Sequence, residues 1–216
     1  MRINETKKLN NAIFITKDTL RDLSSDKEET ITKNILRWSE KGKLISLKNG
    51  IYILKETYDS YSKDANFLNL IANKLRTPSY VSLEYVLSKY NILTEATYPI
   101  TSVTLKTGRT FENKLGTFIY KSIKKELFTG YTIEKFLNND YYIATKTKAL
   151  FDYIYFKANT LPIDIQNFNL VEELRLNLND FSKKDFKELE RYGRISRDRK
   201  IVNIVENIIK HASNNI

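Results

Sequence analysis

The sequence has no cysteine, which excludes disulfides, thiolate zinc sites and cysteine nucleophiles. It has 3 prolines and 6 glycines among 216 residues, so no flexible linker stands out. No apolar run approaches the ~18–20 residues that a membrane span needs, and the first ten residues lack the apolar core of a signal peptide. These absences lead us to expect a cytoplasmic protein with no membrane partner.

Catalytic patterns are also scarce. The single histidine, His211, lies near the carboxyl end, and there is no glycine-rich phosphate loop, HExxH or GxSxG. A metal nuclease would need a Glu-x-Lys strand, whereas "TIEKF" places Glu134 directly before Lys135. We therefore expect no enzymatic activity, no catalytic or metal-binding residues and no cofactor.

Positive charge and aromatic residues are abundant. The chain carries 36 Lys or Arg against 26 Asp or Glu, a net charge of +10, together with 14 Tyr and 11 Phe. Such a balance favours polyanionic partners, chiefly nucleic acid, although a merely solubilising surface would look the same. The length indicates two units, which we place at residues 1–57 and 62–216, with the polar stretch "KETYDSYSKDAN" between them.

Residues 31–54, "ITKNILRWSEKGKLISLKNGIYIL", are the most informative segment of the first unit. Ile31, Ile35 and Trp38 recur at helical spacing, which predicts a helix that buries these three side chains and ends at Gly42. The pattern then changes to a period of two around Asn49-Gly50, which predicts a hairpin with a type I′ turn.

Two further helices are expected before this segment. "NETKKLNNAIFI" predicts one that leads into a buried Phe14, and Thr16 is a candidate N-cap for a short second one. Three helices followed by a hairpin are typical of a winged helix-turn-helix.

In a helix-turn-helix the third helix lies in the major groove of DNA. Arg37 and Asn34 are candidates for reading bases, because arginine can bind guanine and asparagine can bind adenine. The candidates for backbone contacts are Thr32, Lys33, Lys41, Lys43 and, at the hairpin tip, Lys48 and Asn49. An ordinary solvated helix and hairpin remain the alternative.

The second unit begins with two expected helices, "SKDANFLNLIANKLR" and "SYVSLEYVLSKYNIL". Short alternating runs then predict strands: "ITSVTLKTG", "LGTFIYKSI", "YTIEKF" and the start of "DYYIATKTKALFDYIYF", whose second half predicts a helix capped near Thr145. Three helices are expected after residue 167. The predicted class is α+β: an N-terminal winged helix-turn-helix, then a mixed α/β domain with a short antiparallel sheet and a helical C-terminal tail.

Two other basic stretches allow more than one interpretation. Residues 105–125 hold six Lys or Arg and one acidic residue, Glu112, interleaved with Phe111, Phe118 and Tyr120. This pattern fits an RNA-binding sheet, and fits better an antiparallel sheet whose lysines protect an edge. The cluster at residues 191–200 fits a helix junction, a partner contact or further phosphate contacts.

Four segments together resemble the AbiEi family, the antitoxin and transcriptional-regulator components of bacterial type IV toxin–antitoxin and abortive-infection systems. They are "SLKNGIYIL", "PSYVSLEYVLSKYNILTEATYPITSVT", "RTFENKLGTFIYKSIKKELFTGY" and "YYIATKTKALFDYIYF", so the resemblance spans residues 13–156. The most specific parts are residues 79–85 and 145–152. The chain departs from the family pattern in the hairpin, where Lys-Asn-Gly replaces a more arginine-rich sequence.

The resemblance implies a winged helix that binds inverted repeats in double-stranded promoter DNA and represses its own operon. It also implies a second domain that counteracts a nucleotidyltransferase toxin encoded nearby. The positions it carries over to the DNA surface are Thr32, Lys33, Arg37, Lys41, Lys48 and Asn49, and those it carries over to the antitoxin domain are Ser79, Tyr80, Ser82, Glu84 and Tyr85.

Two other functions fit the same sequence. The protein could be an interaction module that binds a toxin or phage component directly, with the winged helix as a scaffold. It could also be an RNA-binding protein that uses residues 105–125 to shield the toxin's target.

Overall fold

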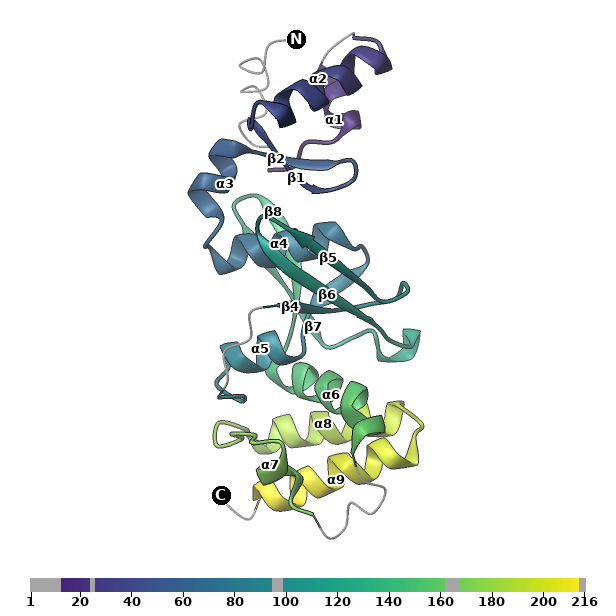
Figure 1. Ribbon diagram of the computed structural model, residues 1–216. Coiled ribbons are helices and arrows are strands. Elements are labelled where there is room, and N and C mark those ends of the chain that lie inside the picture. The colour runs from purple at the N-terminus through teal and green to yellow at the C-terminus, as the bar shows by residue number, and fades with distance from the viewer. Residues whose placement is uncertain (1–12, 24–25, 95–98, 162–167, 214–216) are drawn as a thin grey trace.

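The computed structural model describes residues 13–23, 26–94, 99–161 and 168–213. They form an α+β fold with a six-stranded mixed sheet and a separate two-stranded antiparallel sheet. Figure 1 shows three tiers: two N-terminal helices and a hairpin at one end, the large sheet in the middle, and a group of C-terminal helices at the other end.

The helices and strands have the following bounds. The α-helices are α1 (Lys17–Leu23), α2 (Glu28–Glu40), α3 (Lys55–Tyr61), α4 (Ala65–Leu75), α5 (Glu84–Lys89), α6 (Lys146–Lys157), α7 (Leu170–Glu173), α8 (Lys183–Ile195) and α9 (Arg199–Ser213). The strands are β1 (Leu44–Lys48), β2 (Ile51–Leu54), β3 (Ser79–Val81), β4 (Ile100–Thr104), β5 (Arg109–Asn113), β6 (Gly116–Ser122), β7 (Tyr131–Phe136) and β8 (Asn139–Ala144).

The N-terminal tier is close to the sequence prediction. The Thr16 hydroxyl accepts a hydrogen bond from the Thr19 N–H at 3.1 Å, so Thr16 caps α1 as expected. Helix α2 buries Ile31, Ile35 and Trp38, and Gly42 follows it with a left-handed φ of 65°. The helix predicted before Phe14 falls in residues 1–12, outside the described part of the chain.

The predicted type I′ turn is wrong. That turn needs a positive φ at both central residues, but of the pair Asn49-Gly50 only Gly50 has one, at 80°. The register also shifts between Ser46 and Lys48. A bulge beside the turn therefore accommodates the reversal without placing Asn49 in the left-handed region.

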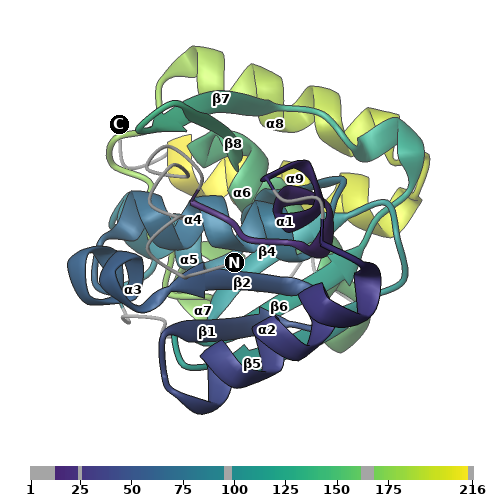
Figure 2. The ribbon, with the colours of Figure 1, turned by 90° about the horizontal axis from the view of Figure 1, so that it is seen from above.

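The β1–β2 hairpin lies between two hydrophobic cores. Leu44 packs with the buried residues of α1 and α2, while Ile45, Leu47 and Ile53 belong to the core of the large sheet. In Figures 1 and 2 the hairpin accordingly lies between the N-terminal helices and the sheet. The polar stretch that was expected between the two units contains α3, whose Tyr58 hydroxyl donates to the Lys114 carbonyl at 3.2 Å.

The large sheet has the strand order β5-β6-β4-β3-β8-β7. Strand β3 pairs parallel with β8, and β4 pairs parallel with β6, while the other neighbours are antiparallel. The expected short antiparallel sheet is therefore wrong, because β3–β8 and β4–β6 are parallel pairs. The sequence prediction also missed β3 and β5. Ser79–Val81 was expected to be helical, but the helix there begins only at Glu84.

Helices cover both faces of the sheet. Helix α4 lies on the side of the hairpin, and α5 and α6 lie on the opposite side (Figure 1). The Asn73 side chain links α4 to the sheet, since its amide accepts from the Tyr142 N–H at 2.8 Å and donates to the Tyr142 carbonyl at 3.1 Å. Ile201, Ile204, Val205 and Ile208 of α9 are buried as predicted.

Candidate functional site

The solvent-facing side of α2 carries the basic residues that the sequence singled out. Thr32, Lys33 and Arg37 are exposed, and Asn34 is half-buried. The Arg37 guanidinium donates to the Asn34 side-chain carbonyl at 2.9 Å, so these two candidates for base contacts lie together. Leu36, with 60% of its surface exposed, lies on the same side.

The candidates that follow α2 divide into two groups. Lys41, Lys43 and Asn49 are exposed, as a contact with a nucleic acid requires. Lys48 points the other way: its ammonium group donates to the Leu75 carbonyl at the end of α4, at 2.7 Å. We therefore exclude Lys48 from the α2 surface, because the hairpin tip packs against the large sheet.

The two most specific segments of the resemblance meet in the interior. The Tyr80 and Ser82 hydroxyls, on or beside β3, both donate to the Asp152 carboxylate of α6, at 3.0 Å and 2.7 Å. The other carboxylate oxygen pairs with the Lys148 ammonium one helical turn earlier. All four side chains have 0% of their surface exposed. Residues about seventy positions apart thus share one buried polar network.

Aromatic rings enclose this network. The Lys148 ammonium lies 4.7 Å from the centre of the Phe151 ring and 5.3 Å from that of Tyr192. Burial lowers the pKa of Lys148 and raises the pKa of Asp152, and in each case the charge of the partner opposes the effect of burial. The network joins β3 to α6 through fully buried side chains.

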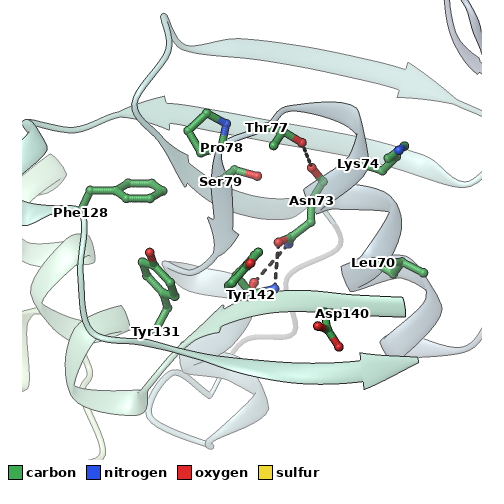
Figure 3. Close-up of a pocket in the computed structure, with 10 residues that line it drawn as sticks. All are labelled: Leu70, Asn73, Lys74, Thr77, Pro78, Ser79, Phe128, Tyr131, Asp140 and Tyr142. Carbon is green, nitrogen blue, oxygen red and sulfur yellow. Dashed lines mark hydrogen bonds between the residues drawn. The ribbon is translucent and has the colours of Figure 1, made fainter. Parts of the chain in front are cut away.

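The remaining residues of that motif lie nearer the surface. Glu84 and Tyr85 are half-buried, and the Tyr85 N–H donates to the Thr101 hydroxyl at 3.2 Å. Ser79 is buried, with 4% of its surface exposed, and lines a cavity of about 390 Å³. Figure 3 shows this cavity between α4 and the β7–β8 hairpin, with Phe128, Tyr131 and Tyr142 at its walls.

The second basic stretch is split by the fold. Phe118 and Tyr120 are buried in the core, which rules them out as an exposed base-stacking surface. Lys106 and Arg109 are exposed and approach Lys48 and the end of α4. Lys74 and Arg76 at that helix end could not be predicted from the sequence, because Lys48, Lys106 and Arg109 are distant from them in the chain.

The basic cluster at residues 191–200 is engaged in local contacts. Arg191 and Arg194 pair with Glu188 and Glu190 on the same helix, α8. The Lys200 ammonium donates to the Leu161 carbonyl at 3.0 Å. These contacts favour the interpretation as a helix junction.

Comparison of the sequence with models of protein families finds no match, and comparison with curated proteins finds none either. Within the described ranges, no three His, Asp or Glu side chains gather in a way that could hold a metal ion. Over the same residues, no helix has both the length and the apolar character needed to cross a bilayer.

Proposed function

We propose that the protein binds double-stranded DNA through the exposed side of α2, as a transcriptional regulator. In this proposal α1, α2 and the β1–β2 hairpin belong to a winged helix-turn-helix, and α2 is its recognition helix. Arg37 and Asn34 contact bases, and Thr32, Lys33, Lys41, Lys43 and Asn49 contact the phosphate backbone.

One observation carries this proposal: the two faces of α2 differ completely. Ile31, Ile35 and Trp38 are buried, whereas Lys33 and Arg37, four residues apart, both face solvent. Figure 1 places α2 at one end of the molecule, where a duplex can approach without meeting the large sheet. The solvent side of α2 carries Lys33 and Arg37 together with the acidic Glu40. A major groove is wide enough to admit an α-helix.

The resemblance to AbiEi proteins extends the proposal to a biological role. We propose that the protein represses its own operon by binding inverted repeats in the promoter, and that its second domain counteracts a nucleotidyltransferase toxin encoded nearby. A single recognition helix reads a short half-site, so two copies would occupy one operator.

The buried network of Tyr80, Ser82, Lys148 and Asp152 limits which residues can form an antitoxin surface. Tyr80 and Ser82 match the family pattern, but their side chains are fully buried against Asp152. Their role in the proposal is to hold the second domain in shape. A toxin would have to meet exposed parts of that domain, such as Ile133 and Leu137 of the β7–β8 hairpin, each 60% exposed.

Binding to a labelled duplex from the operon's own promoter tests the proposal. The double variant Lys33→Ala/Arg37→Ala should bind more weakly, and the slope of log affinity against log salt should fall by about 1.8 if both contact phosphates. If Arg37 contacts only bases, the slope should fall by about 0.9.

The matched control is Lys183→Ala/Lys187→Ala on α8, which removes the same charge from exposed positions far from α2. This control should bind like the wild type. If both double variants lose the same affinity, net charge and not the α2 surface explains binding, and the proposal is wrong.

A further inference from the structure

Five basic side chains gather where the hairpin meets the large sheet. They come from separate segments and are here called the junction cluster: Lys48, Lys74, Arg76, Lys106 and Arg109. None of the five forms an ion pair with an acidic side chain among the described residues. Charges of one sign without a counter-charge are unfavourable in the free protein and favourable for a polyanion.

Hydrogen bonds and ring contacts fix the cluster. The Lys48 ammonium bonds to the Leu75 carbonyl, so it lies beside the backbone between Lys74 and Arg76. The Arg76 guanidinium donates to the Thr107 carbonyl at 2.6 Å, which brings it next to Lys106.

A shared aromatic ring completes the arrangement. The Lys48 ammonium and the Arg109 guanidinium lie 5.7 Å and 5.1 Å from the centre of the Phe111 ring. Burial lowers the pKa of Lys48, and the other four cations lower it further, which agrees with their closeness.

The 390 Å³ cavity opens directly beside this cluster. Lys74 lines it, as do Thr77 and Pro78, which follow Arg76 in the chain. Its volume is within the range of small-molecule sites, about 300–1,000 Å³. Lys74 therefore belongs both to the cluster and to the lining of the cavity.

Three aromatic rings line the cavity. Tyr131 and Tyr142 meet edge to face with their centres 5.5 Å apart, and Phe128 lies 5.5 Å from Tyr131 (Figure 3). The Asn73 amide holds the backbone of Tyr142 in place, so this wall is fixed before anything binds.

Polar residues also line the cavity. Ser79 is one of them, but its hydroxyl oxygen is fully buried and has no hydrogen-bond partner among the described residues. The Asp140 carboxylate, 3.7 Å from the Lys135 ammonium, lies at the same cavity and can accept a hydrogen bond from an amino group.

We infer that this surface binds a single-stranded nucleic acid, with backbone phosphates on the junction cluster and one unpaired base in the aromatic cavity. The combination of cations with exposed aromatic rings is the chemistry that binds single strands. An acidic peptide would satisfy the cations, but its carboxylates supply no planar ring for the cavity. A regular duplex offers phosphates to the cations but no free base for the cavity, because its bases are stacked and paired.

This site is separate from the α2 surface. Helix α2, on which Lys33 and Arg37 are exposed, lies at one end of the molecule. The junction cluster lies where Lys48 of the hairpin bonds to the end of α4. The two surfaces can therefore be tested independently on the same full-length protein.

The first test measures the cluster. Fluorescence anisotropy follows binding of a labelled 12-nucleotide RNA, the same sequence as single-stranded DNA, and the corresponding DNA duplex. Lys74→Ala/Lys106→Ala is the chosen variant, because both side chains are exposed and neither makes a hydrogen bond or ion pair within the described residues. It should lower single-strand affinity about tenfold, and lower the salt slope by about 1.4.

The second test measures the cavity. Tyr142→Ala removes an exposed wall ring, and should lower single-strand affinity about fivefold or more, because one stacked base is lost. Tyr142→Phe keeps the ring and should bind like the wild type. A 2-aminopurine placed in the strand should lose fluorescence on binding to the wild type and to Tyr142→Phe, but not to Tyr142→Ala.

The controls separate this inference from the proposed function. Lys33→Ala/Arg37→Ala should lose duplex binding and keep single-strand binding, and Lys74→Ala/Lys106→Ala should show the reverse. Preference for RNA over single-stranded DNA of the same sequence would identify contacts to the 2′-hydroxyl, while equal binding would identify the shared phosphate and base chemistry. Failure of the wild type to bind either single strand, or equal single-strand affinity for the wild type and both site variants, would overturn the inference.

Discussion

Two helices of this protein carry charged residues four positions apart, with opposite outcomes. On α2, Lys33 and Arg37 repeat one sign and face solvent, and on α6, Lys148 and Asp152 have opposite signs and are fully buried. A like-charge pair at this spacing costs an isolated helix about 0.2–0.5 kcal/mol. The α2 pair therefore does not stabilise the fold, whereas the α6 pair is a buried ion pair within the core.

The comparison teaches that helical spacing fixes which side chains are neighbours but not what surrounds them. Helix α6 is buried on nearly all sides, from Thr147 through Ile154, because the sheet, α5 and α8 enclose it. Helix α2 buries only one stripe of residues. A charged pair costs little at the surface, and in the interior it must be matched by partners such as Tyr80 and Ser82.

The largest expected effect comes from removing the buried carboxylate. Asp152→Ala leaves the Lys148 ammonium without its counter-charge and removes the acceptor of two hydroxyl groups. The free energy of unfolding should fall by about 3–5 kcal/mol, measured by urea denaturation. The double variant Lys148→Met/Asp152→Leu should recover much of that loss, since it removes both charges. A loss below about 1 kcal/mol for Asp152→Ala is what a surface ion pair would give, and it would show that the α6 pair does not differ from an exposed pair.

Substitution of Gly130 tests how tightly the side chains around Lys148 are packed. A methyl group at Gly130 would lie 2.1 Å from the Tyr192 hydroxyl oxygen and 3.0 Å from Cγ of Lys148, at a φ of 77°. Gly42 has a similar φ of 65° but open space around it. Both alanine variants carry backbone strain, so thermal unfolding should show Gly130→Ala to be less stable than Gly42→Ala by about 1–3 kcal/mol, which is the cost of overpacking. Equal stability of the two variants would contradict the packing described around Lys148.

On α2 the expected effect is on binding rather than on stability. Arg37→Ala should reduce discrimination at one base pair by about 1–3 kcal/mol, whereas Lys33→Ala should weaken all duplexes alike. Both variants should unfold within about 0.5 kcal/mol of the wild type, because the side chains are exposed. Selection from a randomised operator library measures the difference. Identical sequence profiles for the two variants would show that Arg37 reads no base.

The smallest expected effect concerns pH and Asp185, which lies in the first turn of α8 and contacts the start of α6. Burial alone would raise the pKa of Asp185, but hydrogen bonds from Ser182 and the contacts with Lys146 and Thr147 bring that pKa down to about 2. The depressed pKa means that Asp185 stabilises the fold above pH 3.8, its unfolded value, and loses this contribution as the pH falls toward 2.

Asp185→Asn should therefore destabilise the protein by up to about 1 kcal/mol at neutral pH, as expected for a lost cap. The difference from the wild type should shrink between pH 4 and pH 2 in urea titrations. A difference that is constant over that range would show that the charge of Asp185 contributes nothing.

Local patterns in the sequence predicted much of this fold. The burial of Ile31, Ile35 and Trp38, the cap at Thr145 and the apolar stripe of α9 follow from spacing and from capping chemistry, which act over a few residues. The missed strands have a different cause. Strand β3 is a three-residue segment buried on both sides, so it shows no alternation, and its helical surroundings hid it.

Most of the candidate sites needed the tertiary structure. The basic side of α2 could be inferred from the sequence because one helix supplies all of it. The outcome for Lys48 could not, because its orientation depends on the end of α4 and on the ring of Phe111. For the same reason the sequence pattern singled out Tyr80 and Ser82, but it could not predict that both bond to Asp152.

The sequence by itself determined the apolar stripes of helices such as α2 and α9, the caps at Thr16 and Thr145, and the strongly basic charge of the protein. The tertiary structure alone decided which charges face water, which are buried in pairs, and which gather into the junction cluster. The physical reason is the distance over which each interaction acts. Helical turns depend on residues that are close in sequence, whereas burial and electrostatic interactions depend on every segment that packs nearby.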